Sequence, residues 1–250
     1  YTAKDPNYAV VDQLLKDIQA LRNQLGLTPT SLKRARQKAE AMSSGQQSPL
    51  EDLLETAHNY ALDHAAAYQA EVDAYVDGCL SGRIRVCPEI VQACERYHRD
   101  LQNPKWEFRP DPANEIIAII ETTICHQQGE FLDATPLRGT PFLLIPYHKF
   151  IVYNVMGFYL AGSQERRFKE ALDFIPRKNI KTTFAAALAW ALALYERRSG
   201  SKVYEVGGAL KQALEGFDFL RYNLRRLKLT VDDDLSLIHI SEPTRRRGIS

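Results

Sequence analysis

The sequence lacks the features that would tie the chain to a membrane or to a highly charged partner. No apolar run is long enough to span a bilayer. The chain begins Tyr1-Thr-Ala-Lys-Asp, with neither a Met nor the profile of a signal peptide. The 32 Lys and Arg residues are balanced by 31 Asp and Glu residues, which leaves a net charge of +1. We therefore expect a cytoplasmic protein with a truncated N-terminus and no membrane contact, in which any nucleic-acid contact uses local basic patches.

Cysteine pairs with metal-ligand spacing are also missing. The four cysteines include no C-x-x-C pair, which favours reduced, buried thiols over disulfides. Cys87, Cys94 and His98 have the chemistry of zinc ligands, and the last two lie one turn apart on a predicted helix. Plain packing explains such a pattern more often, so we predict no metal site there. The 45% hydrophobic and 25% charged residues are typical of a soluble globular chain with one large domain or two small ones.

The most informative stretch of the sequence runs from Arg167 to Glu196. A short apolar run that ends at Pro176 predicts a strand, and the Ala- and Leu-rich segment from Lys181 onward predicts a long helix. Between them lies Pro176-Arg-Lys-Asn-Ile-Lys-Thr-Thr183. A phosphate-binding loop needs backbone N–H groups at a helix N-terminus, a Lys that reaches the outer phosphates and an adjacent hydroxyl for magnesium. Lys181 and Thr182 supply the last two.

Both glycines of the usual G-x-x-x-x-G-K-[ST] pattern are absent, because Ile175 and Ile180 occupy their positions. Ile180 is the more serious departure, since a β-branched residue is costly wherever the backbone must adopt a positive φ or approach a phosphate closely. The residues alone leave two interpretations open. One is a phosphate-binding loop, and the other is an ordinary strand-to-helix turn with solvated basic residues.

The segments on either side of this stretch are mostly predicted to be helical. An amphipathic helix over residues 8 to 25 precedes a basic helix over residues 31 to 41, for which a solvated face and nucleic-acid contact both remain open. The polar residues Ser43 to Pro49 form a linker. Further helices are predicted over residues 50 to 78 and 88 to 102 and from Asp111 onward, with a loop over residues 103 to 110, a strand over residues 202 to 206 and a last helix that ends near Arg226.

One short segment near the N-terminus resembles a known family. Gln24-Leu-Gly-Leu-Thr-Pro-Thr-Ser-Leu-Lys-Arg-Ala35 is similar to the C-terminus of phage terminase small subunits, where a leucine-rich helix precedes a Gly-Leu-Thr-Pro-Ser-x-Arg ending. The resemblance implies that residues 1 to 45 are a helical small-subunit tail. Residues 46 to 62 would then be a linker and the start of the next helix.

From Asp63 onward the chain resembles phage terminase large subunits. Residues 70 to 88 and 93 to 101 look like the helical region that precedes their motor domain. Thr140-Pro-Phe-Leu-Leu-Ile-Pro-Tyr-His-Lys-Phe-Ile-Val152 is similar to their Pro-Phe-x-Leu-x-Pro-Trp-Gln-x-Phe-Ile-Val segment, whose Trp-Gln pair lies near the adenine. Here Tyr147 and His148 replace that pair, so stacking on Tyr147 is kept while the amide that reads the adenine edge is lost. A buried aromatic helix is the alternative interpretation.

The same resemblance gives roles to the loop residues. Large terminases carry Pro-Arg-Lys-Asn-Gly-Lys-[Ser/Thr] there, and this chain matches every position except Ile180. The resemblance implies that Lys181 neutralises charge on the β- and γ-phosphates of ATP, that Thr182 holds Mg²⁺, and that Arg177 responds to the γ-phosphate. The remaining candidate ATP contacts are Lys178, Asn179 and Thr183.

The implied fold class is α/β, with a truncated three-layer P-loop NTPase motor domain over residues 140 to 234 behind an all-helical N-terminal region over residues 63 to 139. The complete protein would use ATP to translocate double-stranded phage DNA into the capsid, in the cytoplasm of an infected bacterial cell. Its expected partners are the portal, the small terminase subunit and further copies of itself in a homo-oligomeric ring. A non-enzymatic DNA-binding packaging adaptor with a defunct P-loop, or another P-loop ATPase such as a helicase, remains an alternative.

The end of the chain limits this interpretation. The resemblance stops before the acidic Walker B strand, the coupling motif and the nuclease domain, so no catalytic residue is named and we expect the fragment to be inactive. Asp232-Asp-Asp precedes its apolar run, which is the reverse of the required order. Residues 235 to 250 look like a translated sequencing adapter and are left out of the predicted fold.

Overall fold

The computed structural model describes residues 49–131, 134–173, 175, 179–196, 203–206 and 210–229. From Leu50 onward these residues belong to one compact unit. The predicted helices over residues 8 to 25 and 31 to 41 lie outside the described residues, as do Arg177, Lys178 and the segment 235 to 250.

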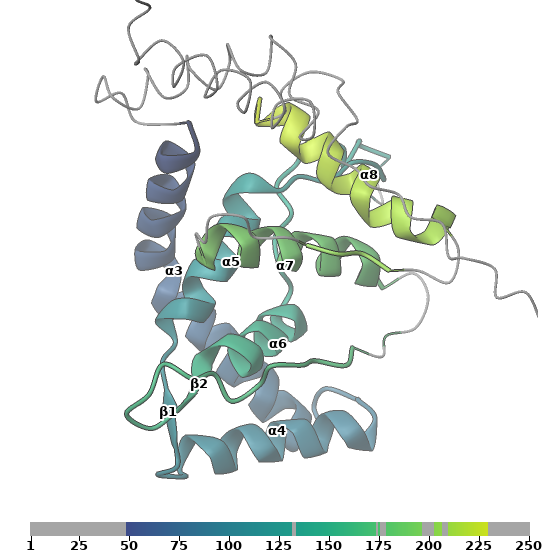
Figure 1. Ribbon diagram of the computed structural model, residues 1–250. Coiled ribbons are helices and arrows are strands. Elements are labelled where there is room, and N and C mark those ends of the chain that lie inside the picture. The colour runs from purple at the N-terminus through teal and green to yellow at the C-terminus, as the bar shows by residue number, and fades with distance from the viewer. Residues whose placement is uncertain are drawn as a thin grey trace, which may run out of the picture. The chain divides into compact units, whose positions relative to one another are not determined.

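The unit is mostly helical and contains one small antiparallel sheet, so it has mixed α/β character (Figure 1). None of the helices in the described ranges is long and apolar enough to cross a membrane. In chain order, the elements are α3 (Pro49–Leu80), α4 (Pro88–Leu101), β1 (Trp106–Phe108), α5 (Asp111–Thr123), α6 (Pro146–Gly157), β2 (Phe158–Leu160), α7 (Lys181–Glu196) and α8 (Leu210–Arg226).

Helix α5 forms the centre of the core. Its isoleucines are buried on several sides of the helix, which is expected of a helix surrounded by other elements. It packs against α6 and α7, and α7 in turn packs against α8 (Figure 1). The predicted helix from Asp111 is thereby confirmed. The buried α5 side chains include Ile116, Ile117, Ile119 and Ile120.

Helix α3 covers the core with the apolar stripe that the sequence predicted. Leu54, Tyr68 and Val72 are among its buried residues, whereas Leu50 at its start is exposed. The predicted stop at Gly78 was wrong, because the helix continues to Leu80. A Cβ at residue 78 would lie 2.6 Å from the Ile84 side chain. The absence of a side chain at Gly78 therefore leaves room for Ile84 in the loop that follows the helix.

Helix α4 begins at Pro88, as predicted, because proline is well suited to a first helical turn. Cys94 and Tyr97 of its predicted stripe are buried, but Leu101 is exposed. Of the four cysteines, which are all unpaired thiols, three are buried as expected and Cys87 is exposed. Burial raises the pKa of the Cys94 thiol to about 12, with Cys79 adding to the shift.

The sheet has only two strands, and the sequence did not predict either of them. Strand β1 pairs with β2 in antiparallel register, with Glu107 opposite Tyr159. Residues 103 to 110 had been predicted as a loop. Three residues are too few to give a pattern, and the pairing depends on a partner about 50 residues away. The sheet joins the end of α4 to the end of α6.

The strands predicted around the loop are absent. Residues 168–173 and 175 form no strand, and neither do residues 203–206. Apolar side chains that a sheet would bury are exposed there, including Leu172 at 94%, Tyr204 at 78% and Val206 at 91%. A strand requires hydrogen bonds to a neighbouring strand, and these two segments do not pair with each other. The described residues therefore contain no parallel sheet.

Candidate functional site

The start of helix α7 is the first part of the site. Ile180 precedes the helix, and its carbonyl accepts a hydrogen bond from the Phe184 N–H at 2.9 Å. Lys181 is exposed and Thr182 and Thr183 are partly exposed in the first turn. The first N–H groups of a helix have no partner within it, so this end attracts an anion. The helix boundary at Lys181 is where the sequence predicted it.

Ile180 adopts the backbone conformation that the sequence argument identified as the difficulty. Its φ is +60°, in the left-handed region, and its side chain is 45% exposed. This conformation costs a β-branched residue roughly 1–3 kcal/mol. It is the conformation that the glycine of a phosphate-binding loop adopts at little cost. Ile180 therefore holds a strained backbone conformation directly before helix α7.

Tyr147 is the second part of the site, and it lies in the first turn of α6. Its hydroxyl donates a hydrogen bond to the Asn179 carbonyl at 3.2 Å. Partial burial raises the pKa of Tyr147, and the nearby Asp173 carboxylate raises it further. The two sequence motifs are 32 residues apart in the chain, yet they meet at this contact. Of the predicted site residues, Arg177 and Lys178 lie outside the described residues.

Asp173 belongs to the same surroundings, and the sequence analysis missed it. Partial burial raises the pKa of its carboxyl group, while the Lys181 ammonium lowers it. Lys181 therefore has a carboxylate near it, which a bound phosphate would have to outcompete. An acidic residue between Leu172 and Phe174, within the apolar end of the run before Pro176, was the signal that could have identified it.

His148 fixes α6 to the first turn of α7. Its ring stacks on the Phe184 ring, with centroids 4.3 Å apart and planes inclined by 18°. The side chain is 1% exposed, and among the described residues neither ring nitrogen has a hydrogen-bond partner. Burial lowers the pKa of His148 to about 4, so the ring is neutral at pH 7. The aromatic segment is thus the start of a helix in which His148 is buried and Tyr147 contacts the loop, and the adenine-site interpretation stays a prediction.

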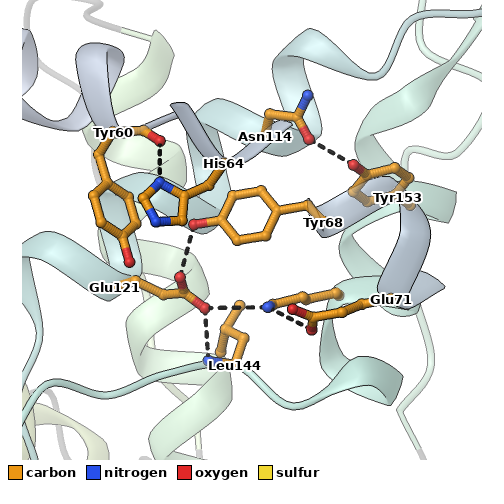
Figure 2. A network of polar contacts seen from close by, with 9 residues as sticks. Tyr60, His64, Tyr68, Glu71, Asn114, Glu121, Leu144 and Tyr153 are labelled. Atoms are coloured by element: carbon orange, nitrogen blue, oxygen red, sulfur yellow. Dashed lines mark hydrogen bonds and ion pairs between the residues drawn. The ribbon is translucent and has the colours of Figure 1, made fainter. Parts of the chain in front are cut away.

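A buried polar network lies behind this helix end (Figure 2). Glu121 of α5 accepts hydrogen bonds from the Tyr68 hydroxyl at 2.7 Å and from the Leu144 N–H at 3.0 Å. Lys149 of α6 pairs with Glu71 at 2.7 Å and with Glu121 at 3.6 Å. The sequence analysis assigned none of these residues to the site. Charged residues within otherwise apolar helices were the available signal.

The residues fit magnesium only as a nucleotide-bound ion. No group of three or more His, Cys, Asp or Glu side chains within the described ranges could hold a metal ion. The Thr182 hydroxyl is the predicted ligand, and Mg²⁺ typically takes one or two protein ligands with water and phosphate oxygens completing its shell. The start of α7 therefore offers an exposed ammonium and two partly exposed hydroxyl groups at a helix N-terminus.

A cavity of about 640 Å³ lies away from this site, between β1 and the segment that follows β2. Three of its basic residues form ion pairs, Arg167 with Asp100, Lys169 with Glu165 and Arg166 with Glu196, and the Lys105 ammonium lies over the Trp106 ring. Arg167 also lies over the Trp106 ring, 4.6 Å from its centroid. The cavity offers few free charges to a ligand, so we do not place the site there. Its lining includes Lys105, Trp106, Arg166, Arg167, Phe168 and Lys169.

The fold is a mainly helical α/β unit in which a residue with positive φ, Ile180, directly precedes helix α7. No family model, curated protein or solved structure matches the chain.

Proposed function

We propose that the chain is part of a phage DNA-packaging motor of the large-terminase type, with a site for ATP at the start of α7. The supporting observation is the hydrogen bond from Tyr147 to Asn179, because it brings the aromatic motif next to the loop motif, as the proposed site needs. Each motif is weak evidence alone, and their proximity is what supports the proposal.

In this proposal Tyr147 stacks on the adenine while the α7 N-terminus receives the phosphates. Lys181 opposes the β- and γ-phosphate charge, and Thr182 holds Mg²⁺. Arg177, Lys178, Asn179 and Thr183 add phosphate contacts. When bound, Mg·ATP supplies the energy for movement of double-stranded DNA in the complete protein, together with the portal, the small terminase subunit and other copies in a ring. The complete protein would act in the cytoplasm of an infected bacterial cell. A three-layer P-loop domain would be completed by parallel strands that the described residues do not contain.

A second candidate function is a non-enzymatic packaging adaptor with a defunct loop. The positive φ of Ile180 favours it, since the strained residue stands where phosphate oxygens would approach. The unpaired segments 168–173 and 203–206 favour it as well. In this case DNA contact, and not ATP, would be the retained activity.

Calorimetric titration with Mg·ATP separates the two candidates. Ile180→Gly removes the β-branched side chain that stands where phosphate oxygens would approach, so we expect ATP binding to tighten by roughly tenfold or more. Adding Lys181→Ala to Ile180→Gly should abolish the gain, because it removes the charge that opposes the phosphates. Lys169→Ala is the matched control, since Lys169 is exposed and pairs with Glu165 outside the site. Equal binding by the parent chain and Ile180→Gly would refute the argument that the Ile180 side chain obstructs the phosphates. Absence of binding by every variant would favour the adaptor.

A further inference from the structure

Glu121 is a carboxylate with an unusually complete set of partners. The residue is 6% exposed, and its two oxygens accept the Tyr68 hydroxyl and the Leu144 N–H (Figure 2). Lys149 Nζ lies 3.6 Å from the oxygen that accepts the Leu144 N–H. A buried carboxylate is tolerated only when it is paired and hydrogen-bonded in this way. The arrangement therefore fixes the relative positions of α3, α5 and the start of α6.

Lys149 is held from three directions. Its ammonium lies 2.7 Å from Glu71 and 4.6 Å from the centre of the Tyr68 ring, and the residue is 5% exposed. A lysine so deeply buried has little freedom to change rotamer without leaving its charge unpaired. Its position on α6 is consequently determined by α3 and α5.

The two anchors of Glu121 enclose the part of α6 that faces the loop. Leu144 lies just before the helix, and Lys149 lies in its first turns, so the residues between them include Tyr147 and His148. The direct contact from Tyr147 to the loop is a single exposed hydrogen bond of 3.2 Å, which contributes little by itself. The position of the Tyr147 ring must therefore be determined mainly by the contacts that hold the start of α6 against α3 and α5.

We infer that Glu121 is a positioning residue that holds Tyr147 at the distance from the α7 N-terminus needed to stack on the base of a nucleoside triphosphate. This inference rests on the proposed nucleotide site. It adds that the helical region before the loop takes part in recognition of the base, while the loop alone recognises the phosphates.

The first test compares two ligands, Mg·ATP and Mg·tripolyphosphate, which share the phosphates but not the base. Both are titrated into the Ile180→Gly chain with and without Glu121→Gln, which keeps the side-chain size and removes the charge. We expect Glu121→Gln to weaken ATP binding by about fivefold, as loss of one aromatic stacking contact would. Tripolyphosphate binding should change by less than about twofold. An equal loss for both ligands, or no loss for either, would overturn the inference.

The matched control is Glu115→Gln, on the same helix. Glu115 pairs with His58. It forms no hydrogen bond or ion pair with the described residues 144 to 149. Glu115→Gln should leave the affinities for Mg·ATP and Mg·tripolyphosphate unchanged. A loss of ATP affinity as large as that in Glu121→Gln would show a general effect of altering α5.

The second test needs no nucleotide, so it remains decisive if the proposed function fails. Hydrogen exchange is measured by mass spectrometry on the parent chain, Glu121→Gln and Glu115→Gln. We expect Glu121→Gln to speed exchange in the peptides covering residues 144 to 149 and 179 to 184 and to leave α4 unchanged. Unchanged exchange in those peptides, or faster exchange throughout the unit, would overturn the inference. If Glu121→Gln does not fold, Glu71→Gln removes only the partly exposed partner of Lys149 and should act in the same direction with a smaller effect.

Discussion

The neutral imidazole of His148 links the candidate site to acid stability. An unfolded histidine binds a proton near pH 6.5, whereas burial lowers the pKa of His148 in the folded chain to about 4. Between these values the unfolded state binds more protons, so the free energy of unfolding falls as the pH falls from 6.5 toward 4. No carboxylate partner of its ring is found within the described residues that could reverse this sign.

We predict that His148→Phe reduces this acid sensitivity. Phenylalanine keeps a ring against Phe184 but cannot bind a proton, so the loss of unfolding free energy between pH 6.5 and pH 4.5 should shrink by about 2 kcal/mol. Urea unfolding at the two pH values measures it. The control is His98→Gln, because His98 is an exposed histidine on α4 away from the contact between His148 and Phe184, and this variant should lose as much unfolding free energy as the parent chain. An unchanged pH dependence in His148→Phe would show that other groups control acid unfolding.

Ile180 shows what the sequence could and could not predict about a single residue. The pattern of the loop identified it as the position where a glycine is expected, and its φ of +60° agrees with that prediction. The sequence analysis passed over Asp173, which lies eight residues before Lys181 in the same stretch. The pattern could not identify Glu121 beneath Leu144, because that contact joins two segments 23 residues apart. Local spacing carries no information about such pairs.

At the level of elements, a buried amide joins helix α8 to the segment that follows α5, beside a hydrogen bond from Arg226 to the Thr123 carbonyl at 2.8 Å. Asn223 is 1% exposed, and its oxygen accepts the Cys125 N–H at 2.7 Å. Its amide nitrogen donates to the Cys125 carbonyl at 3.2 Å and to the Phe219 carbonyl at 3.1 Å. The Asn223 side chain therefore forms hydrogen bonds with both the N–H and the C=O of Cys125, a residue outside the helices and strands.

Asn223→Ala should destabilise the unit by roughly 2–3 kcal/mol, because it leaves the buried N–H and C=O of Cys125 without partners. Chemical denaturation followed by circular dichroism measures the change. Arg221→Ala on the same helix is the comparison, since its ion pair with Asp218 is near the surface and should contribute less than about 1 kcal/mol. Similar losses in the two variants would mean that Asn223 has no special role in docking α8.

The helices could be predicted and the sheet could not, for a physical reason. Apolar spacing and Pro88 located α3, α4 and α5 well, because helix hydrogen bonds are local. The runs at 168–175 and 202–206 had the apolar character of strands, but pairing depends on a neighbour that a single segment cannot reveal. The short strand β1 was missed for the same reason.

At the scale of the whole molecule, the compact unit begins at Leu50, directly after the predicted linker from Ser43 to Pro49. Limited digestion with a protease of broad specificity should therefore cut first within the linker and leave a stable product from about residue 50 onward. Mass spectrometry identifies the cut. A shortened chain without residues 1 to 45 should keep the same thermal midpoint. First cleavage within residues 63 to 228, with the linker protected, would contradict the division.

The exposed apolar side chains at Leu172, Tyr204 and Val206 also affect colloidal behaviour. Segments of this kind adhere to one another in concentrated solution, and charge repulsion between copies is what normally opposes this. The sequence pI is about 7.8, so repulsion is weakest in slightly alkaline buffers. Acidification adds positive charge and favours solubility, but it also approaches the range in which His148 weakens the fold. The most soluble folded preparations are therefore expected in mildly acidic buffer near pH 6.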